Sequence, residues 1–151
     1  MKVLIDTNVF LEVILQREQV DVAIQTLTEL SADKHEVLMS VGGFYGMLYT
    51  VEKYLRKVME MRKPERIATL RTIMAQLLRK YHVAEHDNES LLQGITDLQF
   101  SDLEDSCQYQ VAHRVGCEML ITFNIADYPT GDDAPVKVLT PQQFIDLNTN
   151  K

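Results

Sequence analysis

The sequence lacks any apolar run of about 18 residues, the minimum length for a membrane-spanning helix. It also lacks the charged start, apolar stretch and small-residue cleavage site of a secretory signal. These two absences predict a cytoplasmic protein without a membrane partner. Cysteine is scarce: Cys107 and Cys117 occur without CxxC spacing. This excludes a cysteine-based zinc site or a disulfide framework and predicts two reduced, packed thiols.

Glycine-rich phosphate loops are absent too, since neither GxGxxG nor GxxxxGK[ST] occurs. The glycines at 42, 43 and 46 instead predict close helix packing or a flexible entry into a helix. With 151 residues and 46% hydrophobic content, the chain is predicted to form one domain over residues 1–151 with a full core.

The net charge of −7 argues against simple electrostatic binding to nucleic acid, but the charge is unevenly distributed. Residues 53–80 hold nine basic and two acidic side chains, so this segment is +7 and the rest of the chain is −14. Helical periodicity predicts helices over about 44–61 and 64–80, which would form a basic hairpin. Such a hairpin either contacts a phosphate backbone or is a pair of solvated amphipathic helices. The candidates for RNA contact are Lys53, Arg56, Lys57, Arg62 and Lys63.

Short apolar runs alternate with segments of helical periodicity along the whole chain. The predicted strands are 3–5, 37–39, a weak one at 82–84, 118–122, and an edge strand at 136–139. Strands that alternate with helices are typical of a parallel sheet with helices on both faces. The sequence therefore predicts an α/β fold.

Polar side chains stand where two of these strands end. Asp6 directly follows the first strand, and Thr7 and Asn8 start the next helix. Asn124 and Asp127 follow the strand that ends at about residue 122. In open α/β sheets, ligands bind beyond the carboxyl ends of the strands, so a functional site is predicted there. The alternatives are helix capping at residues 6–8 and a polar loop at residues 124–127.

A third acidic group occurs at residues 101–105. Ser101 and Glu104 fit a capping box, which would explain Glu104 structurally. Asp105 shares a helical stripe with Asp102 and Tyr109, which would place the two acids near the strand ends. The alternative for both is the favourable effect of negative charge in a first helical turn.

Carboxylates that gather at one edge of a sheet repel one another unless they raise each other's pKa or bind a cation. Oxygen ligands without a Cys/His set favour Mg²⁺ or Mn²⁺, which can activate water at a phosphodiester. The chemistry predicted is metal-dependent hydrolysis of nucleic acid.

The chain resembles the PIN-domain nucleases, the fold of the VapC-type toxins, in three motifs. The first is the opening stretch over residues 2–10, the second lies at 100–105, and the third, at 121–128, resembles the family's T-x-N-x-x-D-F. The resemblance implies a three-layer sandwich around a sheet of about five parallel strands.

The same resemblance implies single-stranded RNA as substrate, an antitoxin partner and a homodimer. It also implies a catalytic set of Asp6, Asp105, Asp127 and Asn124, in which Asp6 and Asp105 are the main ligands of Mg²⁺ or Mn²⁺. Supporting roles fall to Asp102, Thr7, Asn8 and Thr122.

The sequence departs from the family at one position. The helix after the second strand usually carries a further acid, or in some branches an Asn, and here Gly46 stands in its place. Glu52 lies about 240° further around that helix and does not simply replace it. Two functions therefore stay open: a metal-dependent endoribonuclease, and a PIN-like module that binds RNA or protein without catalysis.

Overall fold

A computed structural model describes residues 1–129 and 131–151 of the chain, and that part contains a sheet of five parallel strands. The strand order is β3-β2-β1-β4-β5. The strands are β1 (Lys2–Ile5), β2 (Glu36–Ser40), β3 (His82–Ala84), β4 (Met119–Ile121) and β5 (Lys137–Leu139). The helices are α1 (Thr7–Ile14), α2 (Val20–Ala32), α3 (Val41–Lys57), α4 (Lys63–Lys80), α5 (Asn88–Thr96), α6 (Leu103–Arg114) and α7 (Pro141–Thr149), with a 3-10 helix η1 (Ile125–Asp127). The predicted parallel sheet is confirmed.

Strand β1 lies at the centre of the sheet because its side chains are apolar toward both faces. Val3, Leu4 and Ile5 are all fully buried. Val3 pairs with Val37 of β2 on one side and with Met119 of β4 on the other. A strand covered on both faces has no polar side to give to water, so an uninterrupted apolar run is what this position requires.

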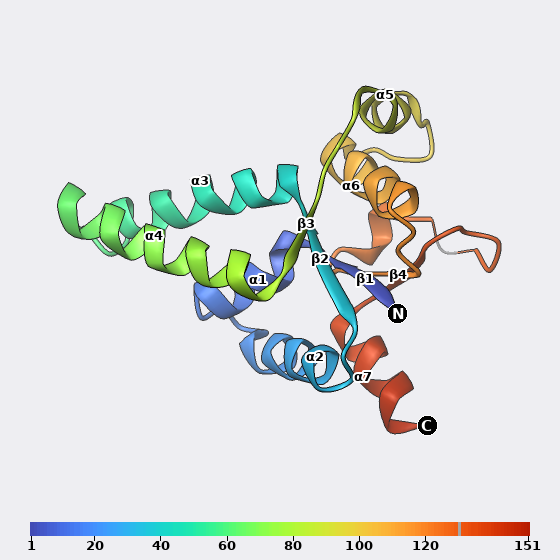
Figure 1. The fold of residues 1–151 in the computed structure, drawn as a ribbon, viewed down its shortest axis with the longest axis horizontal. Coiled ribbons are helices and arrows are strands. Elements are labelled where there is room, and N and C mark those ends of the chain that lie inside the picture. Colours follow the sequence, from blue (N-terminus) through green and yellow to red (C-terminus); the bar gives the residue numbers. More distant parts are fainter. Residues whose placement is uncertain (130) are drawn as a thin grey trace.

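Helices cover both faces of the sheet, which confirms the predicted three-layer sandwich (Figure 1). One face packs against α1, α2, α3, α4 and α7, through side chains such as Ile5 and Met39. The other face packs against α6, through Leu4 and Leu120. Among residues 1–129 and 131–151, no helix is both long enough and apolar enough to cross a membrane.

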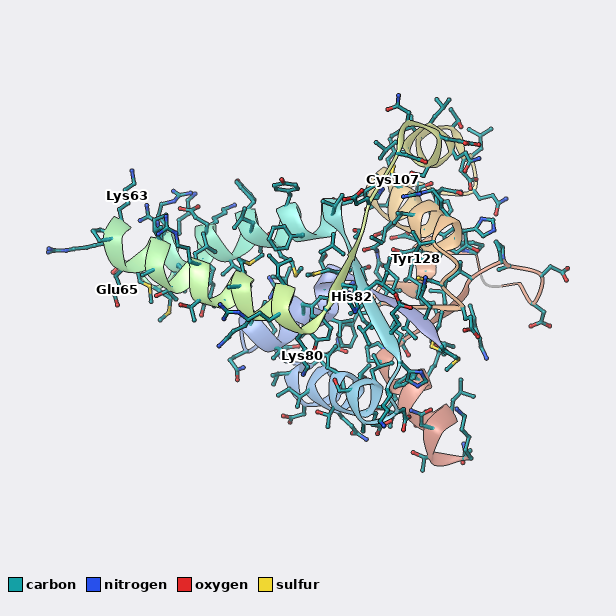
Figure 2. The ribbon with its side chains drawn as sticks, viewed as in Figure 1. Lys63, Glu65, Lys80, His82, Cys107 and Tyr128 are labelled. Carbon is teal, nitrogen blue, oxygen red and sulfur yellow. The ribbon has the colours of Figure 1, made fainter. Side chains whose placement is uncertain are left out.

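Helices α3 and α4 form a hairpin, as the helical periodicity of the basic segment predicted. This hairpin extends away from the sheet (Figure 1). Figure 2 shows Lys63 and Glu65 at its far end and Lys80 at the end next to the sheet. Helix α3 begins at residue 41 rather than at the predicted residue 44, because the Ser40 side chain accepts a hydrogen bond from the Gly43 N–H at 2.9 Å. A serine cap satisfies one of the free N–H groups of the first turn, so the glycines belong to the helix.

Helix α5 lies close against α6. A Cβ added to Gly94 would stand 2.7 Å from the Cα of Cys107, so only glycine allows this approach. The Ser106 hydroxyl donates a hydrogen bond to the carbonyl of Gly94 at 2.7 Å. These contacts hold the N-terminal half of α6, and with it the acids at residues 102–105, in place against the sheet.

Candidate functional site

Asp6 lies at the carboxyl end of β1 and immediately precedes α1. Its side chain is only 5% exposed. It makes no capping hydrogen bond to the helix, so the alternative that this carboxylate serves as a helix cap is wrong. The Thr122 hydroxyl donates to Asp6 Oδ2 at 2.8 Å, Asn8 Nδ2 donates to the same oxygen at 3.4 Å, and the Thr7 hydroxyl donates to Oδ1 at 3.3 Å.

Thr122 connects the ends of β1 and β4. It is fully buried, and its hydroxyl oxygen accepts from the Asn124 backbone N–H at 3.0 Å and from Asn8 Nδ2 at 3.2 Å. Asn8 in turn accepts from the Phe123 N–H at 3.2 Å. The polar groups at these two strand ends are thereby paired, and Asp6 is held in one orientation.

A second group of acids comes from α6 and η1. Asp102, Asp105 and Asp127 each offer a carboxylate oxygen, and these oxygens all lie within 4.8 Å of one another. Asn124 joins two of them, because its Nδ2 donates to Asp105 Oδ2 at 3.2 Å and to Asp127 Oδ2 at 2.6 Å. The residues 124–127 form a 3-10 turn rather than an open loop, and this turn places positions three apart on the same side.

Asp102 is the residue that caps α6. Its Oδ1 accepts from the Asp105 N–H at 3.0 Å, and the helix begins at Leu103. The expected capping box of Ser101 and Glu104 is therefore wrong, because Asp102, one residue after Ser101, occupies the cap position. Glu104 is left exposed, and its Oε1 lies 3.8 Å from where a Cβ on Gly46 would stand. The side of the site that Gly46 leaves without a side chain thus faces a carboxylate of α6.

The pKa of Asp105 is raised to about 7, first by burial and then by the nearby charges of Asp6 and Asp102, with a smaller effect from Asp127. A hydrogen bond from Tyr128 acts in the opposite direction and lowers that pKa. Asp6 is outside the group of three oxygens within 4.8 Å, yet its charge is the largest cause after burial. A divalent cation would relieve this repulsion, and the donor set of carboxylate and amide oxygens suits Mg²⁺ or Mn²⁺.

The raised pKa of Asp105 predicts that the metal-free protein becomes less stable as the pH rises from about 4 to 7. In this range Asp105 keeps its proton in the folded state and loses it in the unfolded state, so unfolding is favoured by rising pH. We expect a slope below the ~1.4 kcal/mol per pH unit of one fully coupled proton, because partial exposure screens the charge. Urea unfolding in EDTA at several pH values measures it. Asp105→Asn should lack this contribution, so its free energy of unfolding should fall less, or rise more, between pH 4 and 7 than that of wild type. An unchanged pH dependence would contradict the assignment to Asp105.

Two buried polar residues near the acids were missed by the sequence analysis. Gln108 of α6 and Tyr128, directly after η1, are each 5% exposed, and Gln108 Nε2 donates to the Tyr128 hydroxyl at 2.9 Å. Figure 2 shows Tyr128 between the sheet and α6. The signals for them were available: a glutamine at a helical position facing the sheet, and a tyrosine where the T-x-N-x-x-D-F motif ends in Phe.

The basic candidates do not join the acids. They are all exposed and lie along the hairpin: Lys53, Arg56, Lys57, Arg62 and Lys63. From the helical rise, Lys53 and Lys57 are about 10 and 16 Å beyond Gly46 along α3. Arg56 forms an ion pair with Glu52 at 3.1 Å, and Arg66 of α4 pairs with the same carboxylate at 3.2 Å.

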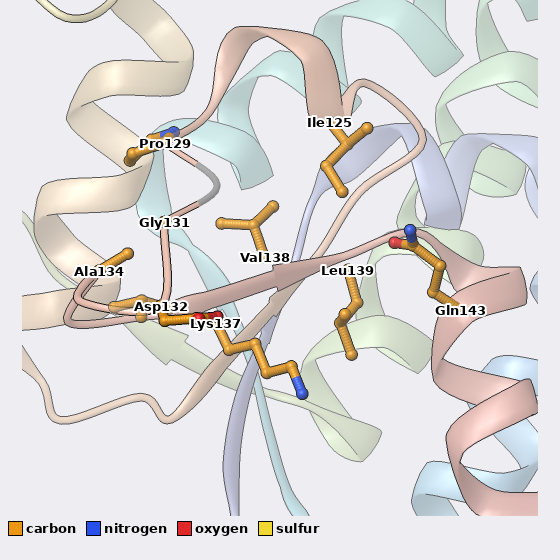
Figure 3. A pocket seen from close by; sticks show the side chains of 10 residues that line it. Ile125, Pro129, Gly131, Asp132, Ala134, Lys137, Val138, Leu139 and Gln143 are labelled. Carbon is orange, nitrogen blue, oxygen red and sulfur yellow. The ribbon is translucent and has the colours of Figure 1, made fainter.

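A pocket of about 480 Å³ lies beside the edge strand β5 (Figure 3). Ile125 of η1, Val138 and Leu139 of β5, and Gln143 of α7 contribute to its lining. Asp6, Asp102, Asp105 and Asp127 do not line it. The acidic site is therefore separate from this pocket.

Comparison with known proteins agrees with the fold. A family model described as PIN domain matches residues 2–126. No curated protein matches the chain. One solved structure with a similar fold is FitAB bound to the IR36 DNA fragment, with a TM-score of 0.67, 15% identity, and coverage of 92% of this chain and 94% of that chain. Another is VapBC2 from Rickettsia felis bound to a DNA fragment from its promoter, with a TM-score of 0.67, 16% identity, and coverage of 93% and 98%.

Proposed function

The chain belongs to the PIN-domain family, and on this basis we propose that it is a metal-dependent endoribonuclease that hydrolyses phosphodiester bonds of single-stranded RNA. The observation that supports this most is the set of carboxylates from β1, α6 and η1, in which Asp105 has a pKa of about 7. Capping of α6 accounts for Asp102 alone, whereas binding of a cation accounts for the whole set of acids.

Asp6 and Asp105 would be the main ligands of Mg²⁺ or Mn²⁺, with Asn124 and Asp127 beside them and Asp102 supporting. When bound, such an ion activates water for attack and neutralises charge that develops at the phosphate. The chain's own contribution is orientation. Thr122 and Asn8 fix Asp6, while the Asn124 amide sets the spacing of Asp105 and Asp127.

Single-stranded RNA is supported by the surface of α3 that leads away from the acids. Tyr45 and Tyr49 are each 65% exposed and lie one turn apart, and Lys53 follows after another turn. Exposed aromatic rings combined with basic side chains are the features on which unpaired bases stack while phosphates are held. A strand that contacts the hairpin through Lys53, Lys57 and Lys63 would be delivered to the acids at its base.

A protein partner is supported by an apolar groove of about 280 Å³ between α1, α2 and α4. Phe10, Ile14, Ile24 and Leu77 contribute to its lining. Grooves of this kind accept one apolar face of a peptide helix. Since the sequence resembles VapC-type toxins, this chain would be the toxin of a toxin–antitoxin pair, and the groove would bind a segment of the antitoxin.

The proposal predicts that the purified protein cuts a mixed single-stranded RNA pool when Mg²⁺ or Mn²⁺ is present and stops when EDTA removes the ion. The expected products are discrete fragments on a denaturing gel. A double-stranded RNA of the same sequences serves as the control substrate and should be cut at least tenfold more slowly. Absence of cleavage with either ion, combined with no rise in melting temperature on adding metal, would overturn the proposal.

Gly46 favours one second candidate, a PIN module that binds RNA through the hairpin without cutting it. The helix carries no acid at this position, and the nearest substitute, Glu104, comes from another helix. In that case RNA binding would be independent of metal. The same assay separates the two candidates, because only the nuclease requires the ion.

A further inference from the structure

Tyr128 places a hydroxyl between the two carboxylates proposed as main metal ligands. Its hydroxyl donates to Asp6 Oδ2 at 3.5 Å, and Asp105 is a second carboxylate beside it. Asp6, Tyr128 and Gln108 are each 5% exposed, so water does not compete strongly for these contacts. A phenylalanine would fill the same space without offering a hydroxyl.

The direction of these hydrogen bonds is set by Gln108. Its side-chain amide donates to the Tyr128 oxygen at 2.9 Å, so that oxygen is the acceptor and its own proton points elsewhere. Its one proton is donated to Asp6 Oδ2. A tyrosine phenol is protonated at neutral pH, so the Tyr128 hydroxyl is available as a donor.

The two carboxylate oxygens of Asp6 receive different numbers of hydrogen bonds. Oδ2 receives hydrogen bonds from Thr122, Asn8 and Tyr128, whereas among residues 1–129 and 131–151 the only donor to Oδ1 is Thr7. The carboxylate is therefore locked through Oδ2, and Oδ1 keeps the spare acceptor capacity. When hydrogen bonds hold one oxygen of a carboxylate, the other oxygen has a fixed direction. Such a carboxylate binds a metal more tightly, because it loses less orientational freedom on binding.

We propose that Tyr128 and Gln108 form a positioning pair that fixes Asp6, beside Asp105, for cation binding. This inference rests on the proposed metal-dependent function. Gln108 acts through Tyr128, and Tyr128 acts through the Asp6 carboxylate. Neither residue is expected to contact the RNA.

A purely structural role for Tyr128 is the alternative, and the same cluster provides the control. The rings of Tyr109 and Tyr128 lie 6.3 Å apart, and both pack near Phe100. The Tyr109 hydroxyl is directed away from the acids and accepts from the Val136 N–H at 3.4 Å. Removing either hydroxyl perturbs the same core, but only Tyr128 contacts the carboxylates.

The experiment compares Tyr128→Phe with Tyr109→Phe, using the Mg²⁺ concentration that gives half of the maximal rise in melting temperature. Loss of an outer hydrogen bond to a ligand typically costs 10- to 100-fold in metal affinity. We expect an increase of about 10-fold for Tyr128→Phe and less than twofold for Tyr109→Phe. Cleavage by Tyr128→Phe should recover at high Mn²⁺, since its defect is in binding the ion.

Gln108→Met, with Gln110→Met on the same helix as its control, tests the pair without altering the ring. Because both residues act along one route, the double variant Tyr128→Phe/Gln108→Met should cost less than the sum of the singles. If wild type responds to Mg²⁺ and both single variants match it, the positioning role is overturned while the proposed function stands. If wild type shows neither metal stabilisation nor cleavage, both are overturned.

Discussion

Replacement of Asp6 or Asp105 by Asn should each reduce metal-dependent RNA cleavage by about 100-fold or more. A neutral amide keeps the shape of the carboxylate but removes the charge that holds the cation. A loss of about 3 kcal/mol of transition-state stabilisation, which is at the lower end of what a metal contributes, corresponds to this factor. Initial rates on a labelled single-stranded RNA at saturating Mg²⁺ measure the effect.

Asp21→Asn, an exposed acid in the first turn of α2, is the matched control, and we expect it to retain cleavage within twofold. Stability provides a second control. In EDTA, Asp105→Asn should be as stable as wild type or more stable at pH 8, since the substitution removes repulsion from Asp6 and Asp102. A variant that cuts RNA at the wild-type rate would show that its acid does not contribute to the proposed chemistry.

The fold was predictable because short apolar runs alternate with helical segments along the chain and the first run is the clearest. Val3–Ile5 is buried on both faces and could only be a central strand of a covered sheet. The boundaries that were wrong depended on single side chains. Ser40 satisfies a free N–H group and starts α3 three residues early, and Asp102 takes the cap position predicted for Ser101. Several polar residues in a row can each cap a helix, and backbone geometry decides which one does.

The candidate site was predictable only in part. Strand ends of a parallel sheet meet at one edge, so Asp6 and Asp127 could be placed there from topology alone. Periodicity places Gln108 on the face of α6 toward the sheet, but the hydrogen bond between Gln108 and Tyr128 depends on how the two side chains point, which periodicity does not fix. Likewise, the proximity of Glu104 to Gly46 arises from the packing of α6 beside α3, a contact between segments more than fifty residues apart.

Removing charge from the hairpin should weaken RNA binding while leaving the chemical step intact. In a triple variant Lys53→Ser/Lys57→Ser/Lys63→Ser, all three exposed lysines are lost without disturbing the Glu52 ion pairs with Arg56 and Arg66. Each phosphate contact contributes about 0.7 to the slope of log affinity against log salt for single strands, so the slope should decrease by about 2. KM should rise about tenfold or more with kcat nearly unchanged, because these side chains act on bound and reacting RNA equally.

The pairing of this variant with Asp105→Asn decides between the nuclease and the binding module. In a nuclease, Asp105→Asn removes cleavage but leaves the salt dependence of RNA binding in EDTA as in wild type. The lysine variant keeps kcat near the wild-type value but lowers the salt dependence of RNA binding. In a module without catalysis, only the lysine variant has any effect, and metal changes nothing. If instead the lysine variant binds RNA as tightly as wild type, with the same salt slope, the basic residues of the hairpin are a solvated surface and the RNA must reach the acids by another face.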